Sequence, residues 1–371
     1  MFTEGEFNIN DLIRNLQQVV QQNCDIADAH HASDFSLCVY LLKMREYYRW
    51  ETGKTYSDEL SKNSISEWLC HKETTWETLE EMDLQSIEIN NTSYDPYDAD
   101  QINSEIVKHE YIYSSGLGLN CRPHFFLGTL LEKIEMDGHS IYISGTELAR
   151  DLPAPPAFSV NKNIFIRKES VKRMVWEKID EWRLETNHNT AFEKVFSQYD
   201  TNKELDKSLD KICDNEIVSM ILHEQGELHA QTILGTDWQK MLADLPRSPA
   251  HFMVRAVRDH IADCYKTLPE LFKQNKTESI HFYFGNFSSI RKKIFPVLID
   301  YYQQWIETDN TAPLLSLLDN AFHHWSKLGK DIIDCWKEFG DNSAPYIEEL
   351  VKQQSLNKTI LNCDTLTNKH E

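Results

Sequence analysis

Four prolines in the C-terminal half of the chain each stand one or two residues after a serine or threonine. The pairs are Ser248-Pro249, Thr267 with Pro269, Thr311 with Pro313, and Ser343 with Pro345. A hydroxyl side chain suits the helix N-cap, and proline suits the first turn because its missing N–H would have no partner there. Each pair therefore predicts the beginning of a helix. Only 12 glycines and 11 prolines occur in 371 residues, which disfavours a turn-rich all-β fold.

The N-terminal half combines helical patterns with one clear β signal. Apolar residues recur at helical spacing over 8–31, which predicts an amphipathic helix. The segment 35–42 carries no charge and is apolar nearly all round, which predicts a helix buried on several sides. An Asp-Gly pair at 137–138, between two alternating segments, predicts a β-hairpin, and 163–166 is a further candidate strand. We therefore expect a mainly α protein, a multi-helix globular bundle with a small β-hairpin-containing insert.

Changes of texture along the chain suggest four parts. We expect an N-terminal helical segment at 1–88 and a mixed α/β insert, with the hairpin and a Pro-rich loop, at 89–168. A C-terminal helical body at 169–356 is expected to pack with the N-terminal helices, and 357–371 is a polar tail.

Composition narrows the class of protein. Apolar content of 41% and aromatic content of 11% are enough for a substantial core, and the formal net charge is -21. Such a charge repels nucleic acids and anionic membranes. No apolar run is long enough for a membrane span or a secretory signal, and no cysteine pair has CxxC spacing. We expect a cytoplasmic protein with reduced cysteines that binds a small molecule or a protein, and neither nucleic acid nor membrane.

The segment 214–229 is the strongest candidate for chemistry. In a helix, Glu216, His223 and Glu227 fall at i, i+7 and i+11 on one face. Inward imidazoles and carboxylates hold metals in helical bundles. The spacing matches neither the Glu-x-x-His pair of di-iron proteins nor the His-Glu-x-x-His of zinc proteases. Two interpretations stay open: half of a metal or acid–base site, or an ion-paired helix with a bend at Gly226.

A second helix supplies the expected partner of this half-site. Asp28 and His31 lie at i, i+3, and His30 and Asp34 at i, i+4, so each pair can touch on a helix. A carboxylate can orient an imidazole for metal ligation or proton transfer, although such a pair is also a common structural hydrogen bond. The expected ion is divalent, such as iron or manganese. The predicted metal ligands are Glu216, His223, Glu227, His31 and Asp34.

Two other polar groups are weaker candidates. Arg255 and Asp259 lie at i, i+4 with His260 beside them, a pattern typical of an exposed charged face or an ion pair between helices. In the segment 114–124, two glycines followed by Arg122 could bring backbone amides to an anion. A plain turn explains that pattern better, because the glycines belong to no known phosphate-binding motif.

Two stretches carry a resemblance to known sequences. The segment 38–50 (CVYLLKMREYYRW) and parts of 123–176, including HFFLG and ARDLPAPP, resemble a family of uncharacterised bacterial cytosolic proteins. The resemblance implies no activity and no site residues.

Two functions are consistent with the sequence. One is a metal-dependent enzyme with His and carboxylate ligands that acts on a small, partly apolar substrate. The other is a non-catalytic interaction or scaffold protein that binds a partner through the 110–168 insert. In that case Glu216, His223 and Glu227 would pair with arginine or lysine.

Overall fold

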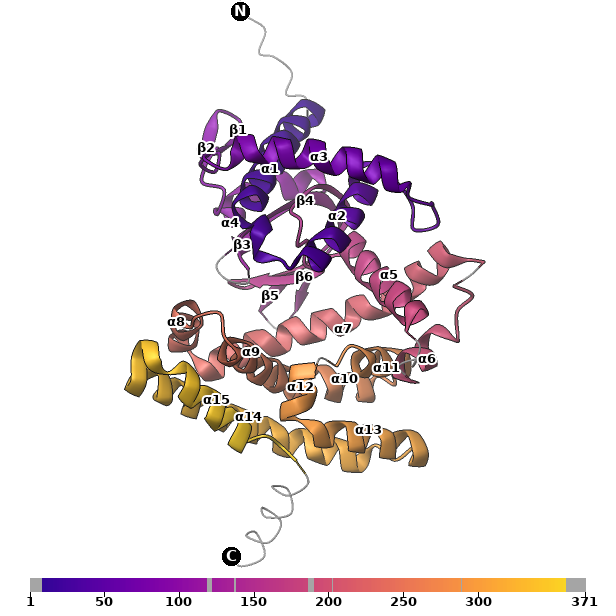
Figure 1. Ribbon diagram of the computed structural model, residues 1–371, viewed down its shortest axis with the longest axis vertical. Helices are drawn as coiled ribbons and strands as arrows, with labels where there is room; N and C mark the ends of the chain where they lie inside the picture. The colour runs from indigo at the N-terminus through magenta and orange to yellow at the C-terminus, as the bar shows by residue number, and fades with distance from the viewer. Residues whose placement is uncertain are drawn as a thin grey trace, which may run out of the picture. The chain divides into compact units, whose positions relative to one another are not determined.

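The chain forms two compact units. The computed structural model describes residues 9–118, 122–136, 138–185, 190–201, 203–287 and 289–357. Unit 1 comprises Met1–Asp180 and Asp200–Cys213, and unit 2 comprises Glu181–Tyr199 and Asp214–Glu371. The chain passes from one unit to the other three times: within α5 (Lys168–Leu184), between Tyr199 and Asp200, and within α7 (Leu205–Leu234). Figure 1 labels both helices.

Unit 1 is built on a mixed β-sheet. Among the described residues its five strands lie in the order β3-β4-β5-β7-β6, with β5 and β7 parallel and the other neighbours antiparallel. A separate two-stranded ribbon pairs β1 with β2. The strands are β1 (Ile87–Ile89), β2 (Thr92–Tyr94), β3 (Tyr111–Leu117), β4 (Pro123–Met136), β5 (His139–Arg150), β6 (Ala157–Val160) and β7 (Asn163–Arg167).

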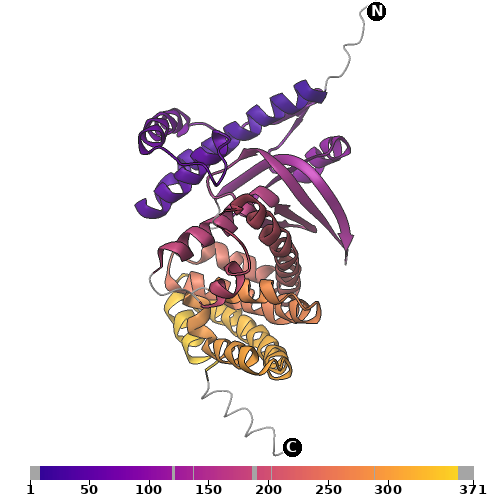
Figure 2. The ribbon, with the colours of Figure 1, turned by 90° about the vertical axis from the view of Figure 1, so that its right-hand side faces the viewer.

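The predicted hairpin is the turn between β4 and β5. Met136 pairs with His139, and Gly138 has φ of 80°, which glycine adopts without steric cost. Asp137 lies outside the described residues. The pairing shifts register between Leu127 and Glu132, and such β-bulges bend a strand. The two long strands accordingly curve along their length (Figure 2).

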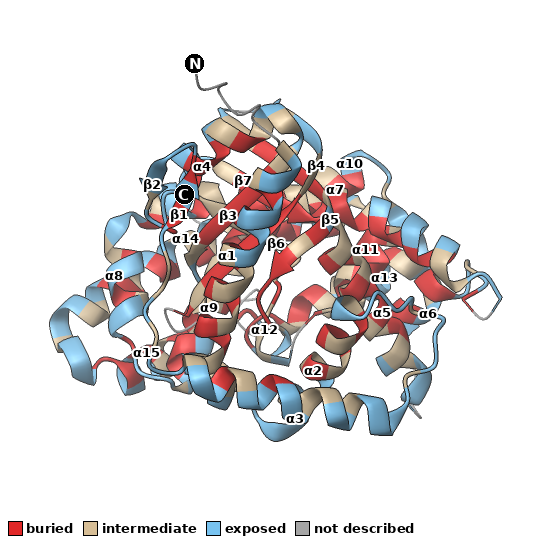
Figure 3. Ribbon diagram, turned by 90° about the horizontal axis from the view of Figure 1, so that it is seen from above, coloured by how far each residue is buried: buried red, intermediate tan, exposed pale blue. Residues whose placement is uncertain are grey.

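Helix α1 covers this sheet, as its amphipathic pattern predicts. It spans Ile9–His31, and its apolar stripe, which includes Leu16 and Val20, is buried with Phe125 and Leu127 of β4. Helix α3 (Lys62–Leu79) packs against α1, and most of α3 is exposed (Figure 3). The other helices of unit 1 are α2 (Leu37–Glu51), α4 (Ala99–Ile106) and the first parts of α5 and α7.

The prediction of a helix buried on several sides is wrong for the first half of α2. Leu37 is 71% exposed and Leu42 56%, whereas Tyr40 on the same half packs with Met44 and Tyr47. Burial begins at Met44 and includes Tyr47. The second half of α2 therefore makes most of the contacts with the core.

Unit 2 is helical throughout its described part. Its core is organised around α14, where Leu318, Trp325 and Ile332 are almost fully buried among residues of the neighbouring helices. Besides parts of α5 and α7, the α-helices are α6 (Thr190–Phe196), α8 (Thr236–Asp244), α9 (Pro249–Ala262), α10 (Leu268–Lys273), α11 (Thr277–Gly285), α12 (Ser289–Ile294), α13 (Pro296–Thr308), α14 (Ala312–Phe339) and α15 (Ala344–Gln353). The mainly α fold with a hairpin-containing insert is thus confirmed. No helix in the described ranges combines the length and apolarity needed to cross a lipid bilayer.

All four proline pairs lie at helix starts, and the pair Thr267 and Pro269 begins α10 within a continuous helical run. Helices α9, α14 and α15 begin at Pro249, Ala312 and Ala344, although the hydroxyl before each makes no capping hydrogen bond. Pro269 instead lies in a continuous helical run, directly after the π-helical turn η4 (Asp263–Thr267). There the Leu268 N–H donates to the Asp263 carbonyl, five residues back. The wider turn accommodates a proline that lacks its own N–H.

Candidate metal centre

Glycine 226 allows two helices of unit 2 to approach closely. Helix α7 is continuous through Gly226, and a Cβ there would lie 2.6 Å from the Ala262 carbonyl oxygen of α9. A real Cβ does not come so near to a backbone atom. The absence of a side chain therefore sets the spacing of α7 and α9 beside His223 and Glu227.

Three side chains on these helices converge. His223 and Glu227 of α7 and Asp259 of α9 each offer a ligand atom, and these atoms lie within 4.8 Å of one another. The His223 Nε2 lies 3.6 Å from Glu227 Oε1. Neighbouring ligands of a metal bonded at about 2.1 Å stand about 3 Å apart, so the spacing of these atoms is compatible with an ion.

Asp263 fixes the orientation of the imidazole. Its Oδ1 lies 2.8 Å from His223 Nδ1, and its side chain is 1% exposed. A carboxylate on one ring nitrogen of a metal-binding histidine orients the ring and makes the other nitrogen a better ligand. Asp263 is the first residue of the π-helical turn, and such turns are frequent at functional sites.

Two arginines balance the acids. Arg258 donates to Glu227 at 2.5 Å, and Arg291 donates to Asp263 and, at 2.7 Å, to the Tyr283 hydroxyl. The Tyr283 hydroxyl donates to Asp263 at 3.0 Å. With His223 protonated, three cations (Arg258, Arg291, His223) therefore face three carboxylates (Glu227, Asp259, Asp263).

The charges shift the titration of every member of the group. Burial would raise the pKa of Glu227, but Arg258 and His223 lower it to about 2. Burial would lower the pKa of His223, but Asp263 and Glu227 hold it well above its usual range. Burial raises the pKa of Asp259, against the opposing effect of Arg291. Asp259 is thus the acid with the weakest compensation.

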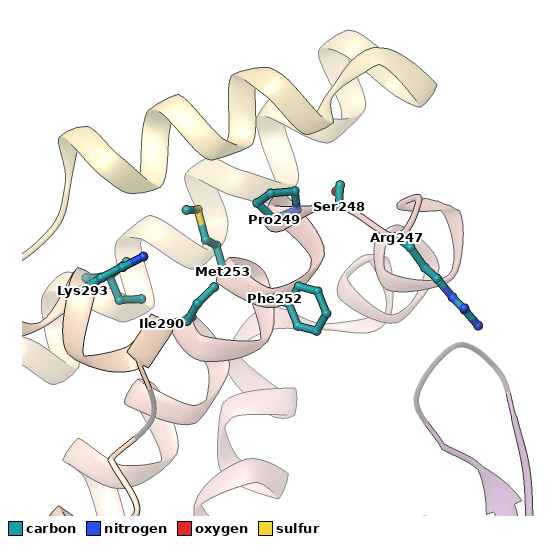
Figure 4. A pocket seen from close by; sticks show the side chains of 8 residues that line it. Arg247, Ser248, Pro249, Phe252, Met253, Ile290 and Lys293 are labelled. Atoms are coloured by element: carbon teal, nitrogen blue, oxygen red, sulfur yellow. The ribbon is translucent and has the colours of Figure 1, made fainter. Parts of the chain in front are cut away.

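The group opens onto a pocket. Asp259 and Arg291 line a hollow of about 310 Å³, together with Arg255 and Phe252. A second hollow of about 480 Å³ shares Phe252 and Ile290 with the first (Figure 4). Volumes of this order suit a small molecule, and of the three candidate ligands Asp259 lines the hollow.

Glu216 does not join the group. It lies two turns before His223, about 10 Å along the helix, and is 4% exposed beside Ser279 and Glu278. Burial raises its pKa to about 8. The described residues whose ligand atoms converge are His223, Glu227 and Asp259.

The predicted partner helix belongs to unit 1, and its pairs differ from those expected. His31 Nδ1 lies 3.0 Å from Asp34, whereas His30 contacts the Glu80 carbonyl. Asp28 accepts from Arg122 at 2.5 Å and from the Leu152 N–H. The expected Asp28–His31 and His30–Asp34 pairs are therefore replaced. Arg122, considered as an anion ligand, is instead the buried partner of Asp28.

Sequence reasoning missed Asp263 and underrated Asp259. The i, i+4 pattern of Arg255 and Asp259 was interpreted as an exposed face or an ion pair, since spacing within one helix cannot identify the helix that faces it. Pro269 was the available signal for Asp263, because a proline inside a helix requires an irregular turn before it.

Comparison with known proteins identifies a family. Residues 172–354 match the C-terminal domain of a family of unknown function (DUF6866), and residues 15–167 match its N-terminal domain. No curated protein and no solved structure matched the chain. The resemblance to an uncharacterised family is confirmed to this extent, while bacterial origin and cytosolic location stay predictions. Since the two matches together cover most of the sequence, the chain belongs to the DUF6866 family of unknown function.

Proposed function

We propose that this protein binds a divalent metal ion through His223, Glu227 and Asp259 and uses it in chemistry on a small molecule. The observation that carries the proposal is the convergence of these three ligand atoms from two helices within 4.8 Å. The Asp263 contact to His223 Nδ1 supports it, because it leaves Nε2 toward Glu227.

One imidazole and two carboxylates favour manganese(II) or iron(II), which accept both ligand types. Three protein ligands leave coordination positions for a substrate or water, the arrangement of catalytic rather than structural metal sites. Bound there, the ion would act as a Lewis acid on a group in the adjoining pocket. Arg258 donates to Glu227 Oε1, the oxygen that faces His223, so an ion bound to this oxygen would displace Arg258. This pair of Arg258 with Glu227 is also what the interaction-protein alternative expects of Glu227.

Calorimetric titration of chelator-treated protein with Mn²⁺ tests the proposal. We expect one ion per chain, and a loss of affinity of more than about 100-fold in His223→Ala and Asp259→Asn, since even outer partners contribute 10–100-fold. Asp263→Asn should lose about 10–100-fold. His323→Ala, which removes an exposed imidazole of α14, is the matched control.

The proposal fails if the wild-type protein binds no Mn²⁺ or Fe²⁺, or if His223→Ala binds as tightly as wild type. The group would then be an ion-pair network within unit 2. Binding of a partner through the 110–168 insert would become the leading function.

A further inference from the structure

Cationic and apolar side chains share the two hollows beside the metal centre. Phe252, Met253 and Ile290 lie together in Figure 4, with Lys293 on one side, and they line the larger hollow. Arg255 and Arg291 line the smaller one. Helix α9 and the short helix α12 supply these residues, so both hollows belong to unit 2.

The distribution of charge in the hollows is opposite to that of the whole chain. The chain has a net charge of -21, yet the residues lining the two hollows include Arg247, Arg255, Arg291 and Lys293 and one carboxylate, Asp259. Asp259 is itself a proposed ion ligand. Arg291 is already bonded to Asp263, so Arg255 and Lys293 are the lining cations that bear on a ligand, and cations lining a hollow of an acidic protein favour an anion there. Arginine is suited to the planar or tetrahedral oxygens of carboxylate and phosphate.

The apolar wall restricts the rest of the ligand. Phe252 is 52% exposed, although a large apolar side chain on a helix usually turns to the core. Phe252 and Ile290 line both hollows, so the two hollows adjoin at these side chains. A molecule with a charged end near Arg255 would have its apolar end against Phe252 and Ile290.

We propose that these two adjoining hollows bind a small molecule that joins one oxyanion, a carboxylate or a phosphate monoester, to an apolar group. Its assignment as the substrate of the metal centre rests on the proposed function. The pocket itself does not, because Arg255, Lys293 and Phe252 are not ion ligands.

Two probes distinguish the kind of oxyanion. Phenyl phosphate and 4-phenylbutyrate are titrated into the full chain with and without Mn²⁺, and benzyl alcohol serves as the uncharged analogue. Saturable binding of either acid, with no binding of the alcohol, is the expected result. The acid that binds more tightly identifies the oxyanion.

Variants locate the binding site. We expect Arg255→Gln to weaken binding by about tenfold or more, because it removes a charge-assisted hydrogen bond. Lys293→Ala should weaken it by about threefold, because it removes an exposed charge. Phe252→Ser should weaken it by about fivefold, because it removes a partly buried ring. Lys327→Ala, at an exposed lysine of α14, should bind as wild type. His223→Ala should still bind the acid in the absence of metal.

The outcomes separate the two proposals. The inference is overturned if neither acid binds saturably, or if the Arg255, Lys293 and Phe252 variants bind like Lys327→Ala. Mn²⁺ binding without acid binding would leave the metal centre and remove this pocket. Acid binding without Mn²⁺ binding would keep the pocket as a ligand site and remove the metal centre.

Discussion

Each unit contains a histidine paired with a buried aspartate, and the surroundings of the two pairs differ. In unit 1, His124 Nδ1 lies 2.6 Å from Asp151, with side chains 4% and 0% exposed. In unit 2, His223 Nδ1 lies 2.8 Å from Asp263, and the His223 side chain is 29% exposed. The same two residue types thus form a sealed pair in one unit and an accessible pair in the other.

The sealed pair is part of a closed ion network. Glu147 accepts from Arg167 at 3.0 Å and from the Ser170 hydroxyl at 2.6 Å, and Arg150 lies 3.6 Å away. Each of these side chains is almost fully buried. The second nitrogen of His124 has no partner among the described residues, and no carboxylate lies opposite it within hydrogen-bond distance. This network therefore fits a role in holding β5, β7 and α5 together.

The accessible pair differs in what faces the second nitrogen. His223 Nε2 points to Glu227, and Asp259 beside it lines a pocket. A histidine–aspartate pair alone therefore does not indicate chemistry. A further acid on the other side of the ring and an opening to solvent are what distinguish a candidate site.

The largest expected change is the loss of stability of unit 1 when the sealed network is broken. Glu147→Gln leaves Arg167 and Arg150 buried without their carboxylate, which should reduce the free energy of unfolding of unit 1 by about 3–5 kcal/mol. Urea denaturation followed by fluorescence measures it. Glu135→Gln, at an exposed acid of β4, should change the value by less than about 0.5 kcal/mol. Equal effects of the two substitutions would contradict the description of the network as sealed.

The next effect tests how the accessible site is formed. Gly226→Ala places a Cβ against the Ala262 backbone and should force α7 and α9 apart, at a cost of about 1–3 kcal/mol. The same displacement should weaken Mn²⁺ binding, because Asp259 moves away from His223. Gln231→Ala, at an exposed position of the same helix, provides the control. Unchanged stability and Mn²⁺ affinity in Gly226→Ala would show that the close contact is not needed.

Helices and the hairpin were predictable because their signals are local. The amphipathic spacing of 8–31 and the Asp-Gly pair before β5 predicted α1 and the β4–β5 turn. The first half of α2 was not predictable, because an apolar sequence does not say whether another segment covers it. Leu37 belongs to this apolar segment and is nevertheless exposed.

Half of the candidate site was also predictable, because its signal is local to one helix. His223 and Glu227 share one helix face, and their spacing in the sequence shows it. Asp259 and Asp263 are recruited by the packing of α9 against α7, which depends on Gly226 and on the π-helical turn before Pro269. A pattern within one segment contains no information about that contact.

The buried carboxyl of Glu216 should make the stability of the protein depend on pH. Burial raises its pKa from 4.5 to about 8, so folded protein retains a proton that unfolded protein releases above pH 4.5. Stability is therefore lost as the pH rises from about 4.5 to about 8. Glu216→Gln should remove this loss and stabilise the protein at pH 8 by on the order of a few kcal/mol, with little effect at pH 4.5. Thermal melts at both pH values measure it, and a gain of equal size at both would contradict a buried acid.

The smallest effect concerns the proton on His223. Asp263 and Glu227 raise its pKa, so without metal its pairing stabilises the fold fully below about pH 6.5, and the contribution is lost as the pH rises through the raised value. Metal binding needs the neutral ring, so one proton must leave and Mn²⁺ affinity should rise by about tenfold per pH unit below that pKa. Titration in two buffers of different ionisation enthalpy counts the proton.

Asp263→Asn removes an acid that raises the pKa of His223 and should reduce the pH dependence of Mn²⁺ affinity, while His323→Ala should keep it. An Mn²⁺ affinity that does not change between pH 6 and 8 would place His223 outside the coordination sphere, and the accessible pair would then differ from the sealed one only in exposure.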